Sequence, residues 1–517
     1  MTHEVHEYSE QCLRSLCLLP RKLERSDSYR LRGEDEVGAK PQLRYIANYL
    51  KELDCKTVIA EEEYVDHDYL DDYATYYSRC YQGYRRKCLR LHFFDQVITP
   101  GQYGSFLGTG EGATRDTLTS SYLGFVVLRP LPEAFIGRTC LKRYPPNAEG
   151  GHSRQYPATF GCKSHLAGLA LKTQSLPFQE QDTVVAACAT TAIWAAFQRM
   201  ANLFRMEAPT PARITAMATE HGHQHSRVLP SQGLELGQMC RTFLSSGLEV
   251  EVRNGEKLAT DASLKELVHA YGALGLPAIL GLQPLQDPGD DRHAVAIAGY
   301  AMATKPAPPP QTLDLALAAH AMERLYVHDD QVGPFLSCEF QGVYSPSIRY
   351  TRAGDGSTSS VFALVIPVYP KIRIRYESAK DAVVMFDGKV RALFGVTWTW
   401  DIRLVLGQDV LAELGKDAPL SPKLRSHVAA GAYPRFVWLA SAADGATAQV
   451  ALLLDATDIE RSNFVHEILF LNESFAVAMQ HVLSDETSSG LLQKDLERAS
   501  TWRAKVSKGL TLSESVE

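Results

Sequence analysis

One cysteine stands directly ahead of a strongly helical pattern, and this arrangement constrains the fold and the chemistry more than any other feature of the chain. From Ile193 onward, the apolar residues Phe197, Met200 and Phe204 recur at helical spacing, so we expect a helix that buries one face. Cys188 lies at the N-terminus of that helix, where unpaired backbone N–H groups and the helix dipole favour a thiolate over a thiol. The alternative is that Cys188 is an ordinary small core residue.

A thiolate mechanism needs a base, and His293 is the candidate. It begins a short apolar run that ends at Tyr300 and is typical of a buried strand entered from a polar turn. An imidazole at such a position can take and return a proton near neutral pH. A second run, residues 324–330, is also typical of a strand and ends at Asp329 and Asp330. If the two strands pair, Asp329 would orient the imidazole, with Asp330 as the alternative.

At these residues the chain resembles the papain-like cysteine peptidases, and among them the bacteriocin-leader-processing peptidases, over roughly residues 164–345. The resemblance implies that Cys188 is the nucleophile, His293 the general base and Asp329 its orienter. It also implies an upstream glutamine that completes the oxyanion hole. That glutamine usually stands six positions before the cysteine, where this chain has Asp182. Gln181 is therefore our first choice for the oxyanion donor, and Gln179 is the alternative.

The order of elements between the cysteine and the histidine is also similar to that family. The patterns predict helices, a strand, a helix and a strand, at residues 210–220 and 232–246, then 249–253, 262–274 and 277–281. The implied fold class is α+β, with the nucleophile helix packed on an antiparallel sheet. A proline-rich insertion at 301–322 separates the two strands of the site. We expect it to be either a solvated loop or a segment that overhangs the cleft.

With 517 residues, the chain is too long for one ordinary domain. We expect an N-terminal α/β domain of unknown role, a papain-like catalytic domain, a C-terminal strand-rich α+β domain and a polar tail, helical or disordered, at residues 1–150, 151–370, 371–483 and 484–517. The flanking domains would present substrate or gate the cleft.

Periodicity predicts further elements in those flanking regions. We expect helices at about 41–53 and 66–92, a strand at 372–376 and helices over 464–482. The mixed charges between 61 and 90, acidic at one end and basic at the other, favour a solvated helix face.

Composition limits the partners and the compartment. The apolar fraction of 45% and charged fraction of 22% are those of a soluble globular protein, and a net charge of −7 gives no footprint for nucleic acid. The N-terminus lacks a signal-like apolar segment, and no run reaches the length of a membrane span. Ten cysteines without framework spacing fit free thiols in a reducing cytoplasm. We therefore expect a cytoplasmic protein without nucleic-acid or membrane partners.

One other cluster has metal-ligating residue types. His221, His223 and His225 stand close together, and Cys162 and His165 are three positions apart. Neither group has the spacing of an established metal motif, so we interpret the histidines as a polar loop and expect no metal or cofactor.

The residues together predict a cysteine peptidase that attacks a peptide or isopeptide carbonyl. Its partner would be a protein or peptide substrate, and a regulatory protein partner is an open option. The same triad supports a transglutaminase-like or deamidating acyltransferase. The displaced glutamine keeps open a non-catalytic recognition module, and the extra domains keep open a toxin or defence effector that its own flanking domains hold inactive.

Overall fold

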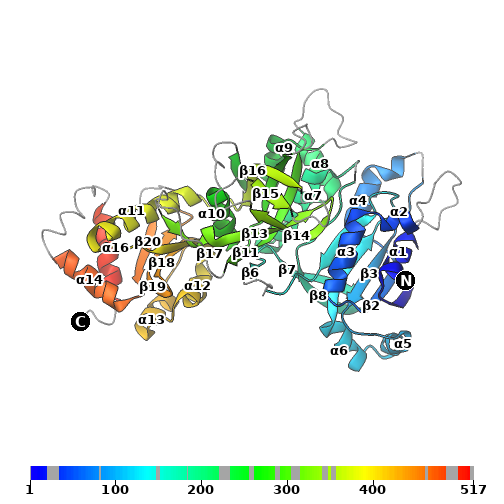
Figure 1. Cartoon of the computed structure of the whole chain (residues 1–517), viewed down its shortest axis with the longest axis horizontal. Helices are drawn as coiled ribbons and strands as arrows, with labels where there is room; N and C mark the ends of the chain where they lie inside the picture. The colour runs from blue at the N-terminus through cyan, green and yellow to red at the C-terminus, as the bar shows by residue number, and fades with distance from the viewer. Residues whose placement is uncertain are drawn as a thin grey trace. The chain divides into compact units, whose positions relative to one another are not determined.

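The chain forms two compact units. The computed structural model describes residues 2–19, 34–80, 83–146, 152–182, 184–220, 233–254, 261–285, 292–303, 315–340, 347–350, 357–459, 464–484 and 499–512. The first unit comprises Met1–Ala259, Pro277–Ala301 and Glu323–Pro367, and the second comprises Thr260–Leu276, Met302–Met322 and Val368–Glu517. Both units combine helices with mainly antiparallel sheets, so the α+β fold class is confirmed at this level (Figure 1).

The first unit begins with a five-stranded antiparallel sheet in the order β1-β2-β3-β4-β5. The strands are β1 His3–Glu7, β2 Thr57–Tyr64, β3 Cys88–Phe94, β4 Tyr122–Leu128 and β5 Ile136–Leu141. The surrounding helices are α1 Glu10–Leu18, α2 Glu34–Gly38, α3 Pro41–Glu52, α4 His67–Thr75, the short 3₁₀ helix η2 Tyr77–Arg79, α5 Pro100–Thr109 and α6 Ala113–Ser120. Helix α3 buries Leu43, Ile46 and Leu50, at helical spacing, in the same core as Leu91 and Phe93 of β3.

The second sheet of this unit carries part of the candidate site. Its order is β10-β11-β13-β14-β15-β16-β9, and β6 adds a pairing with β11. Because β10 pairs with both β11 and β16, the strands from β10 to β16 close into a ring, which leaves none of them as an open edge. The strands are β6 His152–Gln155, β9 Glu249–Asn254, β10 Ala278–Pro284, β11 His293–Ala303, β13 Met322–Asp329, β14 Gly333–Phe340, β15 Ser347–Tyr350 and β16 Thr358–Val368.

Helix α7, Cys188–Phe204, is the helix that the sequence predicts after the cysteine. Its middle is buried on nearly every side, since Ile193, Trp194 and Phe197 are all fully buried. The apolar spacing predicts only one buried face, and the structure corrects this because the first sheet's elements also pack on α7. Two more helices, α8 Pro211–Thr219 and α9 Leu236–Ser245, and a hairpin, β7 Phe160–Leu166 and β8 Leu169–Ser175, complete the unit.

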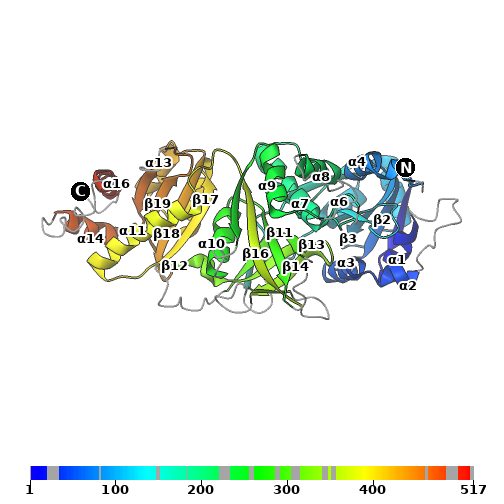
Figure 2. The same cartoon turned by 90° about the horizontal axis from the view of Figure 1, so that it is seen from above.

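The second unit contains a five-stranded sheet in the order β12-β17-β18-β19-β20. Figure 2 shows α11 lying alongside this sheet, and Trp400 of β17 donates a hydrogen bond from Nε1 to Asp387 of α11 at 2.8 Å. The elements are β12 Ala316–Leu317, β17 Thr399–Leu406, β18 Phe436–Asp444, β19 Thr447–Asp455, β20 Val465–Phe470, α10 Asp261–Gly272, α11 Tyr376–Phe394, α12 Val410–Asp417, α13 Pro422–Ala430, α14 Glu473–Ser484, α16 Ala499–Leu510 and the 3₁₀ helices η4 Ala318–Ala321 and η5 Gly407–Asp409.

Several expected elements in the flanking regions are wrong. The helix expected over 66–92 ends at Thr75, and β3 begins at Cys88, because a strand buried on both faces has the same continuous apolar content as a buried helix. The alternating residues 372–376 form no strand: Ile372 and Ile374 are buried, but the amides of Arg373 and Ile374 both donate to the carbonyl of Ala456. Residues 464–482 begin with β20 and only then become helical.

The division into units also differs from the expected boundaries at residues 150 and 370. Helix α10, expected in the catalytic domain, belongs to the second unit. Part of the insertion between the two site strands does as well, since β12 pairs in parallel with β17. The rest of that insertion, 304–314, lies outside the described residues, as does most of the expected tail.

Within the described part of the chain, none of the helices combines the length and the apolar character that crossing a membrane requires.

Close packing of β6 on β11 predicts a strong effect of Gly299→Ala. A Cβ at Gly299 would overlap the carbonyl of Gln155 and lie 2.6 Å from the ring of Tyr156. We expect the variant to lose about 1–3 kcal/mol in the free energy of unfolding and to lose amide protection along β11. Urea denaturation and hydrogen exchange measure both.

The matched control is Gly104→Ala in α5, where a Cβ meets nothing within 4 Å. This change should stabilise the helix by about 0.5–1 kcal/mol. Equal behaviour of the two variants would contradict the packing described for β11.

Candidate active site

The fold brings Cys188, His293 and Asp329 together from three separate elements. Cys188 is half-buried and is the first residue of α7. His293 is the first residue of β11, and Asp329 is the last residue of β13, its neighbour in the sheet. Because the first residue of β11 lies beside the last residue of β13, the imidazole and the carboxylate lie at the same end of these two strands.

A direct hydrogen bond joins the histidine to the aspartate. Nε2 of His293 lies 2.9 Å from Oδ1 of Asp329 and 3.6 Å from Oδ1 of Asp330. The same Oδ1 of Asp329 accepts a hydrogen bond from the amide of Gln331 at 3.0 Å, which fixes the carboxylate at the turn after β13. Asp329 is fully buried. Of the two acids considered from the sequence, Asp329 therefore has the geometry of an orienter.

The cysteine contacts the same imidazole. Cys188 is among the groups whose interaction raises the pKa of His293. Since Nε2 is hydrogen-bonded to Asp329, the remaining ring nitrogen, Nδ1, is the one available to the thiol. Nδ1 is buried and has no hydrogen-bond partner among the described residues. The imidazole thus lies between a thiol and a carboxylate, as proton transfer from cysteine to histidine requires.

Electrostatics favour the charged imidazole. Burial lowers the pKa of His293, but the charge and hydrogen bond of Asp329, together with Cys188 and Asp330, outweigh burial and hold this pKa well above 6.5. A histidine with a raised pKa stabilises the fold fully below its unfolded pKa, and this contribution is lost as the pH rises through the folded pKa. The raised pKa thus favours the imidazolium over the neutral ring.

Asp330 has a different environment. Burial raises its pKa to about 7, while the charge of His293 lowers it and that of Asp329 raises it. The backbone carbonyl of Asp330 accepts a hydrogen bond from Nε2 of Gln42 at 3.1 Å. Gln42 belongs to α3, which packs on the first sheet, so this contact ties Asp330 to that part of the unit.

The start of α7 offers hydrogen-bond donors to an oxyanion. Its N-cap residue, Ala187, has no side chain that could accept from the first turn. Among the glutamines, Gln181 is half-buried, and Gln179 is 3% exposed with an Nε2 group that has no hydrogen-bond partner in the described structure. Both remain candidate donors.

Asp182, six positions before Cys188, organises the loop before the cysteine. Its Oδ1 accepts hydrogen bonds from the amides of Val184, Val185 and Ala186, and its Oδ2 accepts one from the hydroxyl of Tyr77 at 2.9 Å. Both carboxylate oxygens of Asp182 act as hydrogen-bond acceptors in these contacts, so Asp182 does not supply the N–H donor that a glutamine would offer to an oxyanion. It instead shapes the turn that leads into α7.

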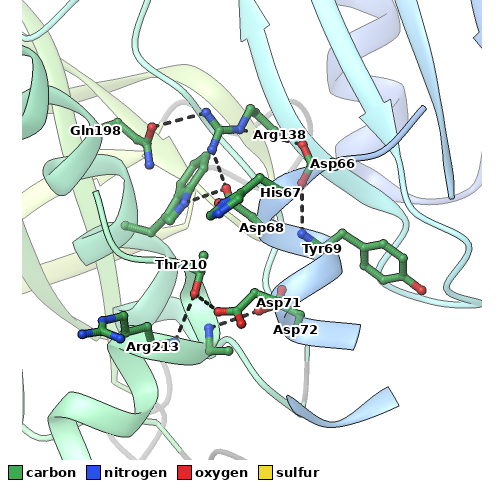
Figure 3. Close-up of polar contacts among 12 residues, drawn as sticks. Asp66, His67, Asp68, Tyr69, Asp71, Asp72, Arg138, Gln198, Thr210 and Arg213 are labelled. Carbon is green, nitrogen blue, oxygen red and sulfur yellow. Dashed lines mark hydrogen bonds and ion pairs between the residues drawn. The ribbon is translucent and has the colours of Figure 1, made fainter. Parts of the chain in front are cut away.

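A buried polar network anchors α7 to the first sheet (Figure 3). Nε1 of Trp194 donates to Oδ2 of Asp68 at 3.0 Å, and Nη2 of Arg138 donates to the same oxygen at 2.6 Å. Arg138 also donates to Gln198 at 3.3 Å and stacks 5.3 Å from the Trp194 ring. The network joins α4, β5 and α7 through a shared carboxylate, so it fixes the helix that carries the cysteine.

This network corrects an expectation from charge patterning. Asp66, Asp68 and Asp72 are buried at 4%, 4% and 1% exposure, so the acidic run is not a solvated helix face. Asp66 caps α4, and Asp72 accepts a hydrogen bond from the amide of Ala212 at 3.1 Å. The aspartates interspersed with tyrosines on α4 were the sequence signal for buried acids. Their hydrogen-bond partners, such as Arg138 and Ala212, come from distant segments of the chain.

Cys162 and His165, considered from the sequence as a possible metal pair, do not form a group. Cys162 is buried and His165 is exposed, so the two side chains leave β7 on opposite sides. The cluster from His221 to His225 lies outside the described residues. Within the described residues, a different set could hold a cation: His293, Asp329 and Asp330, with ligand atoms within 4.8 Å of one another.

A scan against models of known protein families found no match to this chain, and a search of curated proteins found none either.

The contacts of Asp182 predict how its variants behave. Asp182→Ala leaves three amides and the Tyr77 hydroxyl without their acceptor, so we expect faster hydrogen exchange at 184–186 and slower alkylation of Cys188. Asp182→Asn keeps an oxygen acceptor and should restore most of the protection.

Tyr77→Phe is the control, because it removes one hydrogen bond and leaves the turn intact. If the alanine variant exchanges these amides at the wild-type rate, Asp182 does not organise the loop.

Proposed function

We propose that the first unit is a papain-like thiol hydrolase that cleaves peptide or isopeptide bonds. The observation that carries the proposal is the buried imidazole of His293, which contacts Cys188 and is hydrogen-bonded to Asp329. A cysteine at a helix start, a histidine and an orienting aspartate are the groups that nucleophilic acyl transfer needs. The resemblance to papain-like peptidases over residues 164–345 is consistent with the same roles.

In the proposed reaction, the Cys188 thiolate attacks the substrate carbonyl carbon and forms a tetrahedral intermediate. His293, as imidazolium, donates its proton to the leaving amine, and a thioester remains on Cys188. A water molecule then loses a proton to neutral His293, attacks the thioester and releases the acid, which regenerates the thiolate. Asp329 keeps Nδ1 directed at the sulfur throughout, because it holds Nε2.

The oxyanion of each intermediate would be stabilised by the Cys188 amide at the start of α7 and by a glutamine amide, with Gln181 before Gln179. If an amine replaces water in the second half, the same groups perform acyl transfer, and a glutamine side chain as substrate would give deamidation. A recognition module would bind a partner through the same fold without turnover, and a toxin or defence effector would act on a target in another cell or host. Experiment distinguishes these alternatives.

The first test measures thiol reactivity. Cys188 contacts the imidazole of His293, so iodoacetamide should alkylate Cys188 faster than the other cysteines. His293→Ala should slow this alkylation. Mapping by mass spectrometry identifies which cysteine reacts first.

Cys240 and Cys12 are internal controls, because they are also half-buried and burial raises the pKa of both thiols. Cys240 and Cys12 should react with iodoacetamide more slowly than Cys188 under the same conditions. Equal rates at all of these cysteines would remove the support for an activated nucleophile.

The second test measures turnover. Wild type, Cys188→Ala, His293→Ala and Asp329→Ala are incubated with cellular proteins, and mass spectrometry detects new termini, deamidation or amine adducts. We expect new termini that vanish in Cys188→Ala and fall by about 10²–10⁴-fold in His293→Ala, with a smaller loss in Asp329→Ala.

Asp116→Asn, at an exposed position on α6, controls for handling. Adducts or deamidation in place of termini would reassign the site to acyl transfer. If Cys188→Ala retains the full biological effect of the protein in its host, the domain acts by binding and not by catalysis.

A further inference from the structure

One buried acid at the candidate site has no hydrogen-bond donor. Asp330 is 3% exposed, and neither of its carboxylate oxygens has a hydrogen-bond partner in the described structure. Other buried acids differ: Asp387 accepts from Trp400 and Arg391, and Glu61 accepts from Arg90. Burying a carboxylate without a hydrogen-bond donor is costly, and the cationic group that faces Asp330 in the described structure is the imidazole of His293, 3.6 Å away, with no hydrogen bond between them.

The carboxylate of Asp330, which has no hydrogen bond, lies beside a second acid and a histidine. Oδ1 of Asp330 lies 3.6 Å from Nε2 of His293, and Oδ1 of Asp329 lies 2.9 Å from the same nitrogen. Metal bonds of about 2.0–2.2 Å place neighbouring ligand atoms about 3.0–3.5 Å apart. The two spacings to Nε2, 2.9 and 3.6 Å, bracket this range, and the ligand atoms of all three residues lie within 4.8 Å of one another, so shifts of the side chains would let them ligate one ion.

The donor set indicates the class of ion. One imidazole nitrogen and two carboxylate oxygens form a mixed N and O site, which suits first-row divalent cations such as Mn²⁺, Fe²⁺ or Zn²⁺. The two carboxylates supply negative charge. The carboxylate of Asp329 accepts a hydrogen bond from the amide of Gln331, and the backbone carbonyl of Asp330 accepts one from the side chain of Gln42, so both acids are held in place before any ion binds.

We propose that His293, Asp329 and Asp330 form a divalent-metal site whose occupation switches the enzyme off. The inhibitory part of this inference rests on the proposed function. A metal ion that binds Nε2 displaces the proton of that nitrogen to solvent, and the remaining imidazole proton then resides on Nδ1, the nitrogen left for Cys188. His293 can then no longer accept a proton from the thiol or from water, so both halves of the reaction stop.

The test uses Mn²⁺, because its paramagnetic resonance signal distinguishes free from bound ion and because it binds thiols poorly, an advantage in a chain with ten cysteines. Chelator-treated full-length protein is titrated with Mn²⁺ in the wild-type, Cys188→Ala, Asp330→Asn and Asp330→Ala forms. We expect one ion per chain in wild type and in Cys188→Ala. Both Asp330 variants should lose at least about tenfold in affinity.

Asp116→Asn should bind like wild type, and thermal unfolding shows whether each Asp330 variant is folded. In parallel, Mn²⁺ should lower the turnover of wild type, and a chelator should restore it. No binding to wild type, or binding that survives in a folded Asp330 variant, overturns the site. An increase in turnover, or no change at saturating Mn²⁺, overturns the inhibitory role.

The two proposals fail separately. Stoichiometric Mn²⁺ binding in a protein without turnover would keep the metal site and refute the peptidase. Turnover that requires Cys188, in a protein that binds no Mn²⁺, would do the opposite.

Discussion

The part-buried hydrogen bond between Asp329 and Nε2 of His293 is the interaction on which the geometry of the candidate site depends. It holds Nε2 of the imidazole on the carboxylate, which leaves Nδ1 as the ring nitrogen available to Cys188. It also keeps the imidazole charged, because the fully buried carboxylate outweighs the cost of burying the ring. The ring of paired strands that contains β11 and β13 fixes both partners, since each stands at the end of a strand with neighbours on both sides.

The nucleophile depends on a second set of buried polar contacts. Asp182 shapes the turn before α7, and Asp68 ties Trp194 and Arg138 together beneath the helix. Asp68 and Arg138, and Tyr77, which donates to Asp182, come from the region before residue 150, which the sequence suggested as a separate domain. This region and helix α7 belong to one compact unit. Removing one partner of the buried network would leave the other charges unpaired, so the network disfavours separation of the two. The thiol and the imidazole are thus held by independent parts of that unit.

Local patterns predicted much of the fold and the principal site residues. The helix at Cys188, the strand at His293 and the strand ending at Asp329 all follow from apolar periodicity and polar ends, which depend on neighbours in the chain. Periodicity failed where one pattern fits two structures. The apolar run of β3 extended an expected helix, and alternating isoleucines near residue 374 suggested a strand whose backbone instead bonds to Ala456.

The sequence by itself determined which elements form around Cys188, His293 and Asp329, and in which order, because the energetics of helices, strands and turns are set within a few residues. Only the tertiary structure decided that Asp329 and not Asp330 holds the imidazole, that the acids of α4 are buried, and that part of the insertion after β11 joins the sheet of the second unit. These outcomes depend on partners far away in the chain, and burial changes the energy of a charged group only after those partners have met.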